Sequence, residues 1–218
     1  MVLLSASVCG LRRLLVMCET YAASHGLKYN ILKSQYMVFE SGRKDKNEIP
    51  LICLHGTPIN RVNQFKYLGH VLATDLKDDL DIERERRALS VRANVIARRF
   101  AGCSREAKVT LFRAFCTSLY TCSLWAHYTQ RAWGALRVQY NNAFRALLGL
   151  PRHCSASGMF VEARVNCFYT TMRGRATSLL RRVRGSSNTV LRVIADGLDC
   201  DYMSHCEGLH SPTSVILW

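Results

Sequence analysis

The densest group of side chains with suitable types for chemistry is acidic and lies between residues 75 and 85. Its members are Asp75, Asp78, Asp79, Asp81, Glu83 and Glu85. Clustered carboxylates are what a two-metal nuclease or polymerase site requires. These residues, however, open an expected helix, where acidic side chains interact favourably with the helix dipole and cap exposed N–H groups. The sequence therefore favours a structural role for the cluster over a metal site.

Motifs of the common enzyme classes are missing from the sequence. It has no G-x-x-x-x-G-K-[ST] phosphate loop, no H-E-x-x-H metal motif and no G-x-S-x-G nucleophile turn. The ten cysteines form no C-x-x-C pair, and a group near the C-terminus has a spacing that matches no zinc pattern. This group consists of Cys200, His205, Cys206 and His210. We therefore predict no metal site and cysteines that stay reduced.

The first residues of the chain do not have the pattern of a targeting segment. No Lys or Arg precedes the apolar run Met1–Leu4, although a secretory signal needs a positively charged start. No stretch reaches the roughly 18 apolar residues of a membrane span. We expect an intracellular protein, in the cytoplasm or the nucleus, that is not secreted and has no membrane partner.

The charge of the chain is strongly positive. Thirty Lys and Arg residues oppose sixteen Asp and Glu residues, which gives a formal charge of +14. Such an excess favours a polyanion as partner, with an anionic membrane surface second and a merely solvated basic surface third. Residues 131–184 contain ten Arg, no Lys and the single acidic residue Glu162. Arginine grips phosphate with a planar fork and stacks on bases, so this bias points to nucleic acid.

Hydrophobic periodicity predicts an α/β segment followed by a helical one. The expected strands cover residues 1–5, 27–41 (with a turn at 30–34) and 50–73, and the expected helices cover 8–25, 75–102, 104–119, 133–148 and 159–184. Ser104 is the expected start of one helix, and Gly149 with Pro151 the expected end of another. The fold class is α+β, with a small α/β lobe at 1–74 and a mostly helical lobe at 75–185. The tail at 186–218 is expected to be poorly ordered, with a weak helix near 190–195.

Two segments together resemble the reverse transcriptases of non-LTR (LINE-type) retrotransposons. The segment 26–34, "GLKYNILKS", fits the pattern G-L-x-x-N-x-x-K-[ST], and "FKYLG" at 65–69 fits the hairpin that holds the primer in that family. The Arg-rich helix after residue 78 and the later "YNNAFRALLGLPR" resemble the family's thumb. The resemblance covers roughly residues 1–185 and depends on the order of these segments.

The resemblance implies a C-terminal palm remnant followed by a thumb. In the family, an apolar stretch similar to "VLLS" follows the paired catalytic aspartates directly, so these would lie upstream of Met1. The chain is then expected to be a truncated RNA-directed DNA polymerase. It would be inactive alone and hold no cofactor, since Mg²⁺ belongs to the intact enzyme. The implied partner is an RNA or DNA primer–template duplex.

The same resemblance assigns roles to individual residues. Lys33 matches a lysine near the departing pyrophosphate, where a proton donor would stabilise developing charge; a solvated turn lysine is the alternative. The implied primer-grip residues are Phe65, Lys66, Tyr67, Leu68 and Gly69. The implied thumb arginines facing the duplex backbone are Arg86, Arg87, Arg92, Arg98 and Arg99, some of which must be ordinary surface residues.

Other outcomes remain open at the level of sequence. The chain could be an exapted basic module that binds nucleic acid through the thumb alone, or a translated relic without a selected role. An apolar strand at 1–5 without a pairing partner would also expose hydrogen-bonding groups. This predicts non-specific self-association through the N-terminal lobe.

Overall fold

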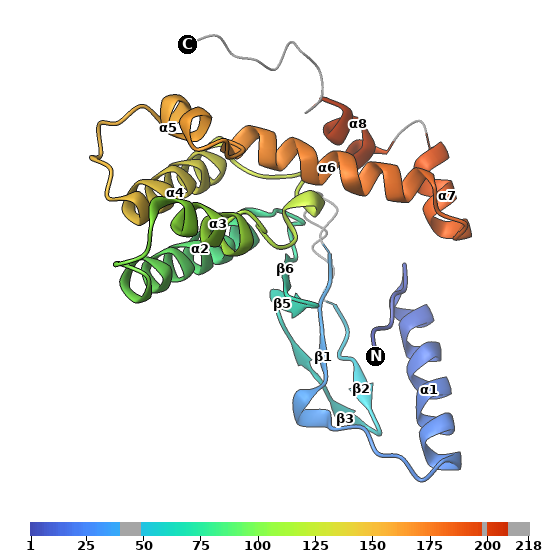
Figure 1. Cartoon of the computed structure of the whole chain (residues 1–218). Coiled ribbons are helices and arrows are strands. Elements are labelled where there is room, and N and C mark those ends of the chain that lie inside the picture. Colours follow the sequence, from blue (N-terminus) through green and yellow to red (C-terminus); the bar gives the residue numbers. More distant parts are fainter. Residues whose placement is uncertain (40–48, 198–199, 209–218) are drawn as a thin grey trace. The chain divides into compact units, whose positions relative to one another are not determined.

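The computed structural model describes residues 1–39, 49–197 and 200–208 of the chain (Figure 1). Helices predominate and the strands are short, in agreement with the predicted α+β class. The chain divides into two compact units, each with its own hydrophobic core. The first unit comprises Met1–Phe65 and Ala73–Leu76, and the second comprises Lys66–Leu72 and Lys77–Trp218. The division falls close to the expected boundary at residue 74 but assigns residues 66–72 to the second unit.

The first unit begins with an exposed segment and helix α1 (Val8–Ser24). Ser7 caps this helix by accepting a hydrogen bond from the Gly10 N–H at 3.0 Å. The strand predicted at residues 1–5 is wrong, because these residues adopt no regular structure and the side chains of Met1 and Leu4 are 83% and 78% exposed. An apolar run forms a strand only where a neighbouring strand takes up its N–H and C=O groups.

Short strands of the first unit form two pairs. The elements are the 3-10 turn η1 (Ile31–Lys33) and strands β1 (Gln35–Tyr36), β2 (Cys53–Leu54), β3 (Thr57–Pro58) and β4 (Asn60–Arg61). Strand β1 pairs with β4 in parallel, and β2 pairs with β3 as an antiparallel hairpin. Ile52, Leu54 and Ile59 form the core, with residues of α1 packed against it. No strand forms at 27–30, contrary to prediction.

A second hairpin joins β5 (Gln64–Tyr67) to β6 (His70–Ala73), and its residues are divided between the two units. The connection has only two residues, Leu68 and Gly69, with φ angles of 46° and 87°. Positive φ at both positions is the geometry of the type I′ turn that suits the twist of a hairpin. The strands predicted in this region are therefore confirmed.

The second unit is built on helices that pack around aromatic side chains. These helices are α2 (Asp79–Arg99), α3 (Arg105–Phe115), the 3-10 turn η2 (Cys122–Leu124) and α4 (Gln130–Leu148). The ring of Phe112 on α3 lies 4.7 Å from that of Phe144 on α4 and meets it edge-on. Ser104 caps α3, and Gly149 ends α4 at φ 67°, as the sequence predicted.

The helix predicted at residues 159–184 is interrupted. The structure has α5 (Ala156–Glu162) and α6 (Phe168–Arg184) instead. Arg164 closes α5 at φ 52°, its N–H donates to the Val161 carbonyl, and the N–H of Val165 donates to the Phe160 carbonyl. This is the Schellman arrangement that ends helices, here with arginine where glycine is usual. Sequence periodicity missed it because no glycine or proline marks the break.

Two short helices follow α6. They are α7 (Thr189–Asp196), which coincides with the weak helix predicted near 190–195, and α8 (Asp201–Gly208), which the sequence analysis did not predict. Met203 and Cys206 of α8 are buried against Ala176 and Leu180 of α6. Among the helices that the structure describes, none is long and apolar enough to cross a membrane.

Candidate nucleic-acid interface

Lys33 lies in a capped turn of the first unit. Asn30 precedes η1 and accepts the Lys33 N–H with its side-chain oxygen at 3.1 Å. The side chain of Ser34 donates to the Asn30 carbonyl at 2.9 Å. Asn30 and Ser34 of this segment therefore have a local structural role, because their side chains close the turn, whereas Lys33 contributes only its backbone N–H. The Lys33 side chain itself is exposed.

The predicted primer-grip residues occupy β5 and its turn. The side chains of Phe65, Tyr67 and Leu68 are 38%, 43% and 74% exposed, and Lys66 is exposed as well. Two features require glycine at position 69, since its φ is 87° and an added Cβ would stand 2.7 Å from the ring of Tyr120. The Tyr120 hydroxyl donates to the Leu68 carbonyl at 2.9 Å. The absence of a side chain at Gly69 thus lets Tyr120, a residue of the second unit, pack closely against the turn.

Three of the five predicted thumb arginines are held in ion pairs on α2. Arg86 binds Glu83 with two nitrogens at 2.6 and 2.8 Å, and Arg87 binds the same carboxylate at 2.7 Å. These arginines lower the pKa of Glu83 to about 2. Arg92 pairs with Glu85, whose side chain is buried. Part of the expected binding charge is therefore neutralised within the helix.

The five arginines also fail to share a face of α2. Arg87 and Arg98 are eleven residues apart, close to three helical turns, so they lie on one side. Arg92 and Arg99 are seven apart and lie on another side, next to the buried residues. Both Arg98 and Arg99 are exposed, and neither has a carboxylate partner among the residues that the structure describes. Only these two of the five offer unmatched charge.

The acidic cluster joins distant parts of the second unit. Asp81 is fully buried and accepts hydrogen bonds from the Val71 N–H at 2.9 Å and from the Trp125 indole at 2.8 Å. It also binds the Arg84 guanidinium at 2.7 Å and the Thr121 hydroxyl at 2.7 Å. Burial opposes ionisation of Asp81, but contacts with His70, Arg84, Thr121 and Trp125 outweigh it, so the pKa of Asp81 is lowered.

Asp78, three residues earlier, has the opposite balance. Its carboxylate accepts the N–H groups of Ala126 and His127 at 2.8 and 2.9 Å and does not cap α2. Burial raises the pKa of Asp78 and exceeds the lowering effect of these two hydrogen bonds. The cluster thus has the expected structural role. Asp78 and Asp81, which lie at the start of α2, fulfil it by joining segments that are far apart in the sequence.

His70 lies between these two carboxylates. Its Nδ1 stands 3.1 Å from Asp81 Oδ2 but outside hydrogen-bond geometry, and its Nε2 is 3.8 Å from Asp78 Oδ1. In the described ranges, no three His, Cys, Asp or Glu side chains are arranged to hold a metal ion. His210, a member of the C-terminal group, lies outside those ranges, and Cys206 is buried in the contact of α8 with α6.

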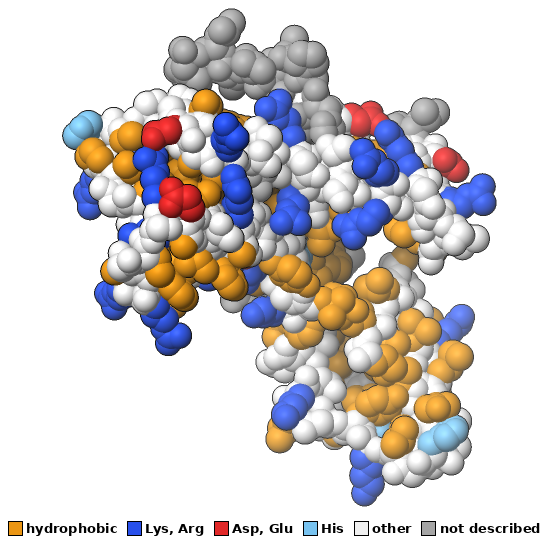
Figure 2. All heavy atoms as spheres, in the orientation of Figure 1, with side chains coloured by type: hydrophobic (Ala, Val, Ile, Leu, Met, Phe, Trp, Pro, Cys, Tyr) orange, Lys and Arg blue, Asp and Glu red, His pale blue; other side chains and the backbone are white. Residues whose placement is uncertain are grey.

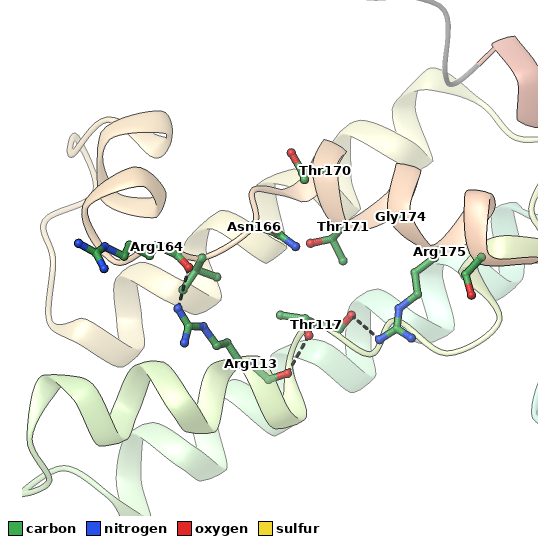
Figure 3. Close-up of a pocket in the computed structure, with 10 residues that line it drawn as sticks. Arg113, Thr117, Arg164, Asn166, Thr170, Thr171, Gly174 and Arg175 are labelled. Atoms are coloured by element: carbon green, nitrogen blue, oxygen red, sulfur yellow. Dashed lines mark hydrogen bonds between the residues drawn. The ribbon is translucent and has the colours of Figure 1, made fainter.

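An open groove of about 380 Å³ lies between α3 and α6. It is lined by Arg113 and Thr117, by Arg164, Val165 and Asn166 of the α5–α6 connection, and by Thr170, Thr171, Gly174, Arg175 and Ser178 of α6 (Figure 3). No carboxylate stands among these lining residues. We call this feature the α3–α6 groove. The general arginine bias of residues 131–184 was visible in the sequence, but nothing there joined Arg175 to Arg113.

The arginines of residues 131–184 keep most of their charge unpaired. Within the described part of the chain, Arg184 alone among the ten binds a carboxylate, that of Glu207. Glu162, the one acidic residue of the segment, binds Arg105 at 2.8 Å. Figure 2 shows Lys and Arg side chains over the visible face of the second unit, whereas hydrophobic side chains dominate the visible face of the first.

Comparison with known proteins adds no relative. The sequence matches no family model and no curated protein, and the structure matches no solved structure. Any assignment of function therefore depends on the residues and geometry described above.

Proposed function

We propose that this chain binds nucleic acid through phosphate contacts made by arginines of the second unit. The role corresponds to that of the thumb in LINE-type reverse transcriptases, which holds the primer–template duplex. The order of the segments at 26–34 and 65–69, followed by an Arg-rich helical region, supports this relationship. The proposed partner is an RNA or DNA duplex, recognised mainly by its backbone.

The observation that carries the proposal is the unpaired charge of residues 131–184. Surface arginines in a protein without a polyanionic partner are commonly balanced by nearby carboxylates. Here Glu162 is engaged by Arg105 of another helix, and nine of the ten arginines have no carboxylate partner among the described residues. Such an array attracts phosphates and gains further energy by releasing the counterions that surround a duplex.

The choice of arginine over lysine favours phosphate as the group that is bound. A guanidinium offers five N–H donors in a rigid fork that matches phosphate oxygens. A guanidinium can also contact aromatic rings. That of Arg137 lies over the ring of Tyr169, 5.8 Å from its centroid, and donates to the Tyr169 hydroxyl at 2.9 Å. A protein that needed only solubility would gain as much from lysine, which is absent from residues 131–184.

The proposal can be tested by measuring duplex binding as a function of salt. Fluorescence anisotropy with a labelled 20-base-pair RNA–DNA duplex should show an affinity that falls steeply with salt. The log–log slope should be about −0.9 for each phosphate contacted. A slope near zero, or strong preference for one base sequence, contradicts the proposal.

Two matched pairs of adjacent arginines make the test specific to the second unit. Replacing Arg181 and Arg182 on α6 by Gln removes two positive charges, and replacing Arg12 and Arg13 on α1 removes the same number. The α6 variant should lose more affinity and should flatten the salt slope by about 0.9 per lost contact. Equal losses would mean that only net charge matters.

A further inference from the structure

The α3–α6 groove has the size and the lining of a ligand site. Its volume of about 380 Å³ lies within the range of small-molecule pockets. Figure 3 shows Arg113 reaching up from α3 toward the Arg164 carbonyl at one end of the groove, and Arg175 reaching down from α6 toward Thr117 at the other end. The polar groups of Asn166 and Thr170 lie at the α6 end of the connection, and both residues are exposed.

Of the three arginines that line the groove, Arg113 and Arg175 are anchored without being neutralised. Arg113 Nη2 donates to the carbonyl oxygens of Arg164 at 2.6 Å and Ala163 at 3.3 Å. Arg175 Nη2 donates to the Thr117 carbonyl at 3.4 Å. These acceptors are neutral, so each side chain is held in place by one nitrogen while its charge and its other N–H donors remain available.

The backbone at the edge of the groove is strained. Arg164 has the left-handed backbone conformation, with φ 52°. This conformation is unfavourable for residues that have a Cβ, whereas glycine adopts it freely. Its carbonyl is the acceptor that fixes Arg113, while its own side chain extends away from Arg175 (Figure 3). Strained residues of this kind tend to occur at binding sites, where the conformation serves a purpose.

We infer that the α3–α6 groove binds the phosphate backbone of the nucleic acid, with Arg113 and Arg175 each contacting a phosphate group at its own end of the groove. This inference rests on the proposed function and assigns it a location. Charge-assisted hydrogen bonds from each guanidinium group hold the phosphate oxygens, and none of the lining residues is a carboxylate that would repel them. Contacts to phosphate carry no sequence information, so the groove should bind duplexes of different sequence equally.

Gly174 allows a test that leaves both arginines and their contacts intact. A Cβ at this groove position would meet nothing within 4 Å, so larger side chains fit. Gly174→Glu places a carboxylate in the groove, and Gly174→Gln is the neutral control of nearly equal shape. Both changes favour the helix over glycine, so neither should unfold α6.

The first measurement uses inorganic phosphate at constant ionic strength, followed by the side-chain N–H signals of arginine in NMR spectra. The signals of Arg113 and Arg175 should shift to saturation in the wild-type chain and in Gly174→Gln. The signal of Arg173, on the other side of α6, should stay unchanged. Gly174→Glu should abolish the saturable shift of Arg175, which follows Gly174 directly in the chain. Absence of saturable shifts in the wild-type chain would overturn the site.

The second measurement uses the duplex and its salt dependence. Gly174→Glu and Arg173→Gln each lower the net charge by one, but Gly174→Glu should weaken duplex binding more. If the two variants bind equally, the duplex does not use the groove, although the proposed function stands. If phosphate binds the groove but no variant or wild-type chain binds the duplex, the proposed function fails, and the groove is a site for free anions only.

Discussion

Arg164 carries a long, charged side chain at a φ of 52°, a conformation that glycine adopts more readily. Arg164→Gly should therefore relieve strain at the end of α5 and raise the free energy of unfolding by about 1 kcal/mol. Gly149 ends α4 with the same hydrogen-bond pattern, so Gly149→Ala should lower the free energy of unfolding by about the same amount. Urea denaturation of both variants measures these changes. Destabilisation by Arg164→Gly would show that the Arg164 side chain supports the turn.

Asp81 and Asp78 offer a contrast between two buried carboxylates on one helix start. Asp81→Asn at pH 7 removes a buried charge that binds the partly buried Arg84, which keeps Glu85 as a partner, so it should lower the free energy of unfolding by about 1.5–3 kcal/mol. Asp78→Asn keeps an acceptor for the Ala126 and His127 N–H groups and removes a charge whose pKa burial has raised. That variant should not lower stability. Equal destabilisation in both would mean that the two charges have equivalent environments.

The pH dependence of stability follows from the same two residues. The folded-state pKa of Asp81 is lowered, so its contribution is present above the unfolded-state pKa of about 3.9 and is lost as the pH falls further. The folded-state pKa of Asp78 is raised, so its contribution is present at low pH and is lost as the pH rises through that value. The difference between the wild-type chain and Asp81→Asn should shrink below about pH 3.9. Denaturation curves between pH 2 and pH 7 test this expectation.

Helix α2, a single element, carries two kinds of arginine. Some are exposed and could contact a ligand, whereas others are already held in ion pairs. Arg98→Gln with Arg99→Gln should weaken duplex binding more than Arg86→Gln with Arg87→Gln. The reason is that Glu83 binds both members of the second pair and cancels part of their charge. Anisotropy at one fixed salt concentration compares the two double variants. A larger loss from the second pair would show that the duplex breaks the Glu83 contacts.

The periodic pattern of α2, α3 and α4 was readable because one face of each helix is buried throughout its length. The break between α5 and α6 was not readable, since the sequence there lacks the glycine or proline that normally marks one. The Schellman hydrogen bonds at Arg164 replace that signal. Short strands such as β1 and β4 were also uncertain, because two residues are too few to show alternation.

For the whole molecule, the two units should differ in stability. Among the described residues, the core cluster of the first unit contains three buried side chains, whereas that of the second includes many fully buried aromatic and aliphatic side chains. Hydrogen exchange should therefore show higher opening free energies in α2 and α4 than in β1 to β4. Limited proteolysis should likewise remove residues 1–70 first and leave a fragment of about residues 80–184. Equal protection of both units would contradict this expectation.

Helix α7 provides an internal comparison for the exchange experiment. It belongs to the second unit, but none of its residues is buried. Its amides should exchange about as fast as those of β1 to β4, because local burial rather than membership of a unit sets the opening energy. Slow exchange in α7 would indicate that another segment covers Val190 and Val193, which are exposed in this structure.

The sequence by itself determined the properties that arise within a few residues of each other. Ser104 and Gly149 mark helix ends, the turn at Leu68 and Gly69 closes a hairpin, and the excess of arginine sets the charge, because capping, turn geometry and composition are local. The tertiary structure decided which arginines remain unpaired and which residues meet. Arg113 and Arg175 are far apart in the sequence and share a groove only because α3 and α6 pack in one unit. Asp81 meets Trp125 for the same reason, since such contacts depend on the packing of entire helices and on no local pattern.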